Sequence, residues 1–143
     1  MTILVMWINH HNMFNYIVKV SREFMLLNGL LLLFVVLTPF TTLLVSNHLV
    51  SGDSHTAASI YSGTFLVLSI AWNILWHNAT HHHDLISGEI PKGQVKRVTR
   101  EYSLGPVFYA ISFLIAFLSA VAAVVAVILI AAFYAITVTG GER

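Results

Sequence analysis

The sequence predicts an all-α, multi-pass transmembrane bundle of four to five helices. Of its 143 residues, 57% are hydrophobic and only 9% are charged, which is far too apolar for a soluble domain of this length. Residues 24–46 and 56–78 contain no Asp, Glu, Lys or Arg. A helix over either stretch would be roughly 34 Å long, enough to cross a hydrocarbon core of about 30 Å. We therefore expect a single transmembrane domain, residues 1–143.

Several classes of protein are excluded by what the chain lacks. It has no cysteine, so a disulfide framework and a thiolate metal site are both excluded. The sequence contains no P-loop, dinucleotide-binding glycine pattern, G-x-S-x-G or H-E-x-x-H. Its seven Lys and Arg residues are too few for a nucleic-acid surface. We therefore expect no enzymatic activity, no cofactor and no nucleic-acid partner.

A helix at about residues 1–18 opens the chain. Its first eight residues are apolar apart from Thr2, and polar residues follow from Asn9 to Asn15. They precede Lys19, where lipid headgroups or water are expected to begin. A signal peptide would start with basic residues and end in a small-residue cleavage site, and this segment shows neither. We interpret it as the last half of a membrane helix.

The second helix, at about residues 24–46, contains a proline that is expected to kink it. Pro39 has no N–H, so the carbonyl near Val35 loses its helical partner. In lipid such a loss is tolerated when nearby hydroxyl groups compensate for it. Thr38, Thr41 and Thr42 stand beside the proline and are predicted to do so.

The third helix, at about residues 56–78, is expected to pack closely against a neighbour. Small side chains let helix backbones approach each other in lipid. They fill the first half of this helix as Ala57, Ala58, Ser59, Ser62, Gly63 and Ser69. Trp72 and Trp76 follow, as expected where a helix approaches the far membrane interface.

A polar, basic loop is predicted at residues 79–102. Pro91 can open a short helix inside it, which would place Lys92, Lys96 and Arg100 four residues apart on one face. Together with Arg97, this stripe is expected to lie at the headgroups and to contact anionic lipid.

The apolar segment that follows is too long for one ordinary span. Residues 103–138 are 36 residues, about 54 Å as a single helix. We predict two helices, at about 104–118 and 120–138, with the turn at Ser119; one long tilted helix is the alternative.

The few charges predict an orientation, because Lys and Arg near membrane helices face the cytoplasm. Lys19 and Arg22 precede the second helix, and Lys92 to Arg100 follow the third. The loop between those helices contains no Lys or Arg. Both basic loops are therefore predicted to be cytoplasmic, in a multi-pass protein of the cell membrane.

Histidines raise the question of a metal site. His77 and His81 are four residues apart, so on a helix they share a face as two metal ligands would. His82, His83 and Asp84 follow directly. The pattern resembles membrane di-iron desaturases and hydroxylases, although the sequence offers one H-x3-H and no H-x2-HH. A membrane di-iron histidine-box oxidoreductase, interfacial histidines without a metal, and a small accessory membrane subunit stay open as alternatives.

Three segments read together resemble one known family. They are WINHHNMF at residues 7–14, LNGLLLLFVVLTPFTTLL at 27–44 and AASIY at 57–61. Their order and spacing are similar to the second, third and fourth helices of the TMEM175 (DUF1211) family of potassium channels. The resemblance implies a six-helix repeat, present as four single-repeat chains in bacteria, that surrounds a path for K⁺ and in some members H⁺.

The same resemblance implies roles for individual residues. Trp7 and His10 or His11 would be polar positions of the second helix that buttress the pore helix, and Asn28 would be the polar position that opens the third. The family's first helix lines the pore and carries Phe-Ser-Asp, which this sequence does not contain. We therefore expect a truncated, partial version of the repeat, lacking the first helix and part of the second, that does not conduct alone.

Overall fold

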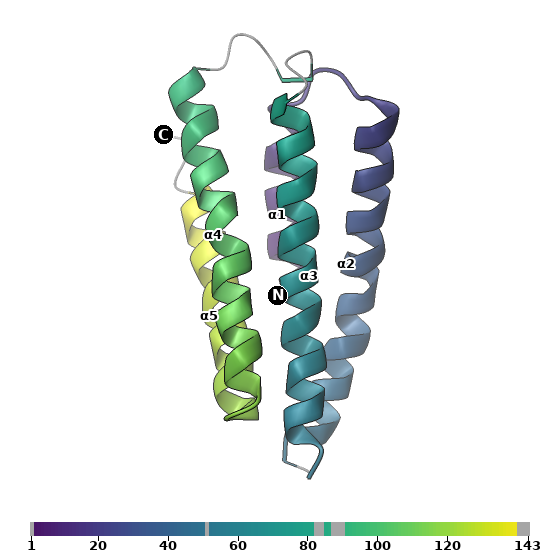
Figure 1. Ribbon diagram of the computed structural model, residues 1–143, viewed down its shortest axis with the longest axis vertical. Coiled ribbons are helices and arrows are strands. Elements are labelled where there is room, and N and C mark those ends of the chain that lie inside the picture. The colour runs from purple at the N-terminus through teal and green to yellow at the C-terminus, as the bar shows by residue number, and fades with distance from the viewer. Residues whose placement is uncertain (1, 51, 82–84, 87–90, 140–143) are drawn as a thin grey trace.

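The structure is a computed structural model that describes residues 2–50, 52–81, 85–86 and 91–139. Within these residues the chain forms five helices that run side by side along one axis (Figure 1). They are α1 (Thr2–Phe14), α2 (Arg22–His48), α3 (Ser54–His81), α4 (Lys92–Ala116) and α5 (Ala120–Thr139). The predicted all-α class is thus confirmed. α3 packs against both α2 and α4, and α5 packs against α4, α3 and α1.

α2 and α3 are the two described helices that are long and apolar enough to cross a bilayer by length and composition. They have 27 and 28 residues, and α5 contains a shorter apolar stretch, Ala120–Ile136. α2 exposes large apolar side chains, including Leu26 (67%), Val36 (73%) and Phe40 (66%). A continuous apolar surface of this kind suits lipid or another protein chain rather than water.

The predicted loop at residues 79–102 is wrong over most of its length. α3 continues to His81, and α4 begins at Lys92 directly after Pro91. The helix after Pro91 is therefore not short, because it continues without interruption into the apolar segment. Charged side chains at a membrane surface need not end a helix, and Arg97 and Glu101 form an i,i+4 ion pair of 3.0 Å along it.

The first helix is shorter than predicted, ending at Phe14 rather than near residue 18. Beyond Phe14 the amides of Tyr16 and Ile17 bond carbonyls three residues back, both at 3.1 Å, which tightens the chain into a turn. Val18 N then donates to Leu85 O at 2.8 Å. The segment after α1 is thereby attached to the segment after α3.

One narrow seam holds α2 against α3. The buried residues Phe24, Leu31, Thr38 and Val45 follow each other at intervals of seven. Leu27, Phe34 and Thr41 lie three residues after the first three of them and are buried or partly buried. This is the a/d pattern of a coiled coil. On the α3 side the small residues Ala57, Ala58 and Ser62 are buried.

A side chain of α3 compensates for a proline in α4. Pro106 lies inside α4 and has no N–H for the carbonyl of Tyr102, four residues earlier. Asn73 Nδ2 donates to that carbonyl at 2.8 Å and to Ser69 O at 2.9 Å. Asn73 therefore supplies the hydrogen bond that the α4 backbone cannot make.

α4 and α5 form a hairpin whose turn lies at residues 117–119, as predicted from the length of the apolar segment. Ser119 Oγ accepts a hydrogen bond from Ala122 N at 3.3 Å, which caps the start of α5. Inside the hairpin, the buried Ser112 Oγ donates to Ala123 O at 3.0 Å. His55 Nδ1 bonds Ala116 O at 2.9 Å and ties the turn to α3.

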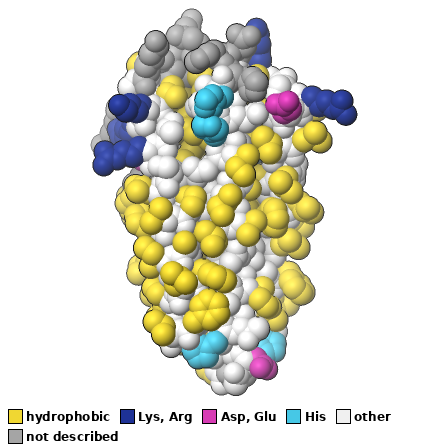
Figure 2. Space-filling model, viewed as in Figure 1, with side chains coloured by type: hydrophobic (Ala, Val, Ile, Leu, Met, Phe, Trp, Pro, Cys, Tyr) yellow, Lys and Arg dark blue, Asp and Glu magenta, His cyan; other side chains and the backbone are white. Residues whose placement is uncertain are grey.

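The described Lys and Arg side chains gather at one end of the molecule. Figure 2 shows Lys and Arg at the end where α2 and α4 begin, and yellow apolar side chains along the middle. At the opposite end the described residues include Asp53, His48 and His55, but no Lys or Arg. The two ends of the bundle thus differ in charge.

Candidate functional site

A hydrogen bond between two polar side chains connects α1 and α2. His10 Nε2 and Asn28 Oδ1 are 2.7 Å apart in a partly buried position. An amide oxygen only accepts, so the ring nitrogen is the donor in this pair. The His10 ring also lies 4.5 Å from Phe14 and 6.1 Å from Trp72, measured between ring centroids. His10 therefore contacts side chains of α1, α2 and α3.

Trp7 and His11 form a separate pair on the outside of α1. Their rings stack with centroids 5.3 Å apart and planes 7° from parallel. Trp7 is 62% exposed, and His11 is also exposed. Of the four residues that the family motif singles out, the structure therefore brings together His10 with Asn28 and Trp7 with His11.

The threonines around Pro39 do form backbone hydrogen bonds, but at other carbonyls than expected. Thr38 Oγ1 donates to Phe34 O at 3.3 Å. Thr41 and Thr42 both donate to Thr38 O, at 3.2 and 2.7 Å. α2 continues through Pro39 as one helix. The hydroxyls support the backbone around the proline rather than the carbonyl of residue 35 itself.

The basic residues of α4 lie near the start of the helix. Lys96, Arg97 and Arg100 are exposed, and Arg97 pairs with Glu101. The side chain of Lys92 lies outside the described residues. The three described side chains face the surroundings of the bundle rather than its interior.

His77 and His81 are adjacent on the last turns of α3. Their ring centroids are 4.1 Å apart, and both side chains are exposed. Among the described residues no group of three or more His, Asp or Glu side chains is arranged to hold a metal ion. His82, His83 and Asp84 lie outside the described residues.

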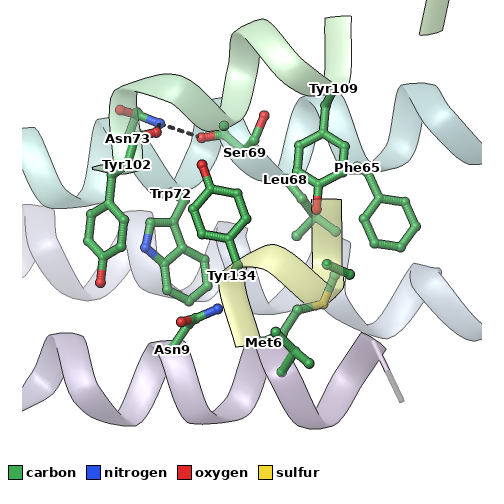
Figure 3. A pocket seen from close by; sticks show the side chains of 13 residues that line it. Met6, Asn9, Phe65, Leu68, Ser69, Trp72, Asn73, Tyr102, Tyr109 and Tyr134 are labelled. Carbon is green, nitrogen blue, oxygen red and sulfur yellow. Dashed lines mark hydrogen bonds between the residues drawn. The ribbon is translucent and has the colours of Figure 1, made fainter. Parts of the chain in front are cut away.

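A cavity of about 80 Å³ lies between α1, α3, α4 and α5. Figure 3 shows Asn9, Trp72, Tyr102 and Tyr134 around it, each from a different helix. The sequence signal for it was weak. Asn9 belonged to the polar residues expected at the end of the first helix, and no sequence periodicity connected it with Trp72, 63 positions later.

The fold and these polar contacts define a class of protein, a multi-pass helical membrane protein with paired polar side chains between its helices. The family model for the "Endosomal/lysosomal potassium channel TMEM175" matches residues 1–39. The chain is also similar to the crystal structure of a lysosomal potassium-selective channel TMEM175 homolog from Chamaesiphon minutus. That match has 35% identity and a TM-score of 0.83, and it covers 96% of this chain and 68% of the other.

Two curated relatives agree with this match. A potassium channel of Chamaesiphon minutus is 36% identical over 118 residues, which is 82% of this chain and 58% of the relative. A potassium channel of Streptomyces collinus is 30% identical over 131 residues, which is 91% of this chain and 64% of the relative. The chain belongs to the TMEM175 family, and it spans about three fifths of these two relatives.

The comparisons bear on the alternatives that the histidines left open. The family and the relatives are named as potassium channels. They give no support to a di-iron oxidoreductase at His77 and His81. Residues 7–14 and most of residues 27–44, which carried the resemblance, fall within the region that the family model matches.

Proposed function

We propose that this chain is a subunit of a potassium-permeable channel. The observation that carries the proposal is the similarity to the solved structure of a potassium-selective channel homolog from Chamaesiphon minutus. Both curated relatives are also named potassium channels. Proton permeability, which the family resemblance implies for some members, is a second property to measure in the same assay.

We infer that the subunits assemble as a homotetramer around the ion path. The seam against α3 uses one side of α2, and the opposite side exposes apolar residues such as Leu26, Leu33 and Val36. In a bilayer such a surface contacts either lipid or another subunit. Native mass spectrometry of the detergent-solubilised chain is expected to give the mass of four copies. A single-copy mass under conditions that preserve the fold would contradict this assembly.

The His10–Asn28 pair is proposed to fix α1 against α2. A buried polar pair is satisfied in one relative position of the two helices, so it restricts how they rotate against each other. The family resemblance implies that the helix carrying His10 buttresses the pore helix. We therefore propose that the pair positions the wall of the pore without contacting the ion.

The basic end is proposed to face the cytoplasm in the cell membrane and to contact anionic lipid. A Lys or Arg close to such a surface contributes about 1 kcal/mol. Lys96→Gln and Arg100→Gln should each reduce anionic-lipid adducts in native mass spectra relative to neutral-lipid adducts. Arg97→Gln should reduce them less, because Arg97 already pairs with Glu101 at 3.0 Å. An equal loss in all three variants would argue against a specific lipid contact.

Ion flux from liposomes tests the proposed channel function directly. Two proteins are compared: the chain itself, and a chimera in which the part of the Chamaesiphon relative outside the matched region is joined to it. We expect the chimera to release K⁺ from loaded liposomes faster than Na⁺, and the flux through the chain itself is measured beside it. Empty liposomes and valinomycin provide the lower and upper limits. A folded, oligomeric chimera that releases no K⁺ would refute the proposal.

A further inference from the structure

The cavity between α1, α3, α4 and α5 is large enough to hold several water molecules. Its volume is about 80 Å³, whereas a water molecule needs roughly 10–15 Å³. The wall is largely aromatic and aliphatic, with Phe65, Leu68 and Tyr109 among its members. None of its 13 lining residues is Asp, Glu, Lys or Arg. Any occupant therefore meets neutral side chains.

Two polar atoms on this wall have unused hydrogen-bonding capacity. Asn9 Oδ1 and Trp72 Nε1 are both buried, and neither makes a hydrogen bond of good geometry in the described part of the chain, although the Tyr102 hydroxyl is close enough to Trp72 to interact with it. The first is an acceptor and the second is a donor. Buried polar atoms in native proteins are nearly always paired, with protein or with ordered water. Figure 3 shows both side chains at the same cavity.

Three other polar side chains of the wall are already committed. Asn73 Nδ2 donates to Ser69 O and Tyr102 O, and Ser69 Oγ donates to Leu66 O at 2.7 Å. Tyr134 donates its hydroxyl hydrogen to Glu101 O at 3.0 Å. Asn9 Oδ1 and Trp72 Nε1 therefore offer an occupant one acceptor and one donor, and the hydroxyls of Tyr102 and Tyr109 on the same wall can donate as well as accept.

This arrangement selects a chemical class. A hydroxyl group both donates and accepts, so it can satisfy an amide oxygen and an indole N–H. A metal cation would be repelled by the N–H, and a carboxylate or phosphate would find no positive charge on the wall. A hydrocarbon would leave both polar atoms unpaired. Neutral hydroxyl compounds fit all three conditions.

We propose that this cavity is a binding site for small neutral hydroxyl compounds, with water as the occupant when no short alcohol is present. The site lies among four helices of one chain and is independent of the proposed ion conduction. Water and alcohol share the same hydroxyl chemistry, and the experiment separates them.

Tryptophan indole resonances provide the test. The full chain is labelled with ¹⁵N-tryptophan and placed in lipid nanodiscs, and single Trp→Phe variants assign its three indole N–H signals. The Trp72 signal is expected to show an exchange or NOE cross-peak to water. The Trp76 signal should not, because Trp76 is buried and donates to Thr99 Oγ1 at 2.8 Å. A Trp72 signal without a water contact, together with no response to alcohol, would mean a dry cavity and overturn the proposal.

Titration with butan-1-ol tests whether an alcohol binds in the cavity. The Trp72 signal should shift saturably, and n-pentane should cause no saturable shift. An equal response to pentane would indicate an apolar site and refute the requirement for a hydroxyl. A shift that rises linearly with butan-1-ol would indicate partition into lipid and refute alcohol binding.

Two glycines provide a matched pair of variants. A methyl group at Gly105 would lie 3.2 Å from Tyr134 Oη at the cavity, and one at Gly63 would lie 3.3 Å from the Phe113 ring, away from it. Gly105→Ala should weaken apparent butan-1-ol affinity at least fivefold, whereas Gly63→Ala should leave it unchanged. Asn9→Leu, which removes the acceptor, should also weaken it. Equal affinities in Gly105→Ala, Asn9→Leu and Gly63→Ala would place the bound alcohol elsewhere and overturn the proposal.

Discussion

Replacing Asn73 by leucine should destabilise the bundle because the side chain substitutes for a missing backbone donor. Asn73 Nδ2 makes two hydrogen bonds, but only one of them is irreplaceable. Ser69 O keeps the helical N–H of residue 73 itself, whereas Tyr102 O faces a proline four residues later and has no such donor. We therefore count one lost bond to a buried carbonyl, about 1–2 kcal/mol.

A second substitution makes the reasoning quantitative. Pro106→Ala supplies the N–H that α4 lacks, so Tyr102 O no longer depends on Asn73. In that background Asn73→Leu should cost less than about 0.5 kcal/mol, which gives a coupling free energy of about 1 kcal/mol. Such coupling is not expected if Asn73 only fills space between α3 and α4.

Unfolding in mixed micelles of increasing dodecyl sulfate content, followed by far-UV circular dichroism, measures these free energies. Asn78→Leu is the matched control on α3, since Asn78 Oδ1 is buried without a hydrogen-bond partner in the described chain. Removing that atom should leave stability unchanged or raise it. An equal cost of Asn73→Leu in the proline and alanine backgrounds would refute the proposed compensation.

Three further predictions follow from other contacts. The chain has no cysteine of its own, and a side chain at Gly52 or Gly93 would lie in open space. An impermeant thiol reagent added outside intact cells should label Gly52→Cys and should not label Gly93→Cys. The reverse labelling would overturn the orientation. Single and double leucine substitutions of His10 and Asn28 should give a coupling of about 0.6–2 kcal/mol in the same unfolding assay, and additive costs would show that the 2.7 Å contact contributes nothing. Trp76→Phe should cost about 1 kcal/mol, because its indole N–H bonds a threonine of α4; an unchanged unfolding curve would contradict that.

The transmembrane helices were predictable from the sequence because the bilayer imposes a length and excludes charge. Residues 24–46 and 56–78 fall within α2 and α3, and a 36-residue apolar segment had to fold back on itself. The start of α4 was not predictable in the same way. Its first turns carry Lys96, Arg97 and Arg100, whose charges resemble those of a loop, and only the proline at residue 91 indicated where a helix could begin.

The packing seam of α2 was hidden for a physical reason. In a soluble helix the buried face is more apolar than the exposed face, so its periodicity is visible. Here the exposed face is rich in leucine, whereas the seam itself contains Thr38 and Thr41. Hydropathy therefore could not distinguish the two sides. The partners of Asn73 and Asn9 were equally inaccessible, because they depend on helices adjacent in space and distant in sequence.

The seven-residue spacing of the seam has a mechanical consequence. An α-helix has 3.6 residues per turn, so a stripe that repeats every 3.5 residues drifts around a straight helix. A left-handed supercoil of α2 and α3 would keep the stripe in contact from Phe24 to Val45, and the seven-residue spacing favours it. Two helices wound in this way would move together as one rigid body. A displacement of α2 at the basic end of the bundle would therefore reach the opposite face of the membrane, where Val45 and the His48 turn lie, without any change in the contacts along the way.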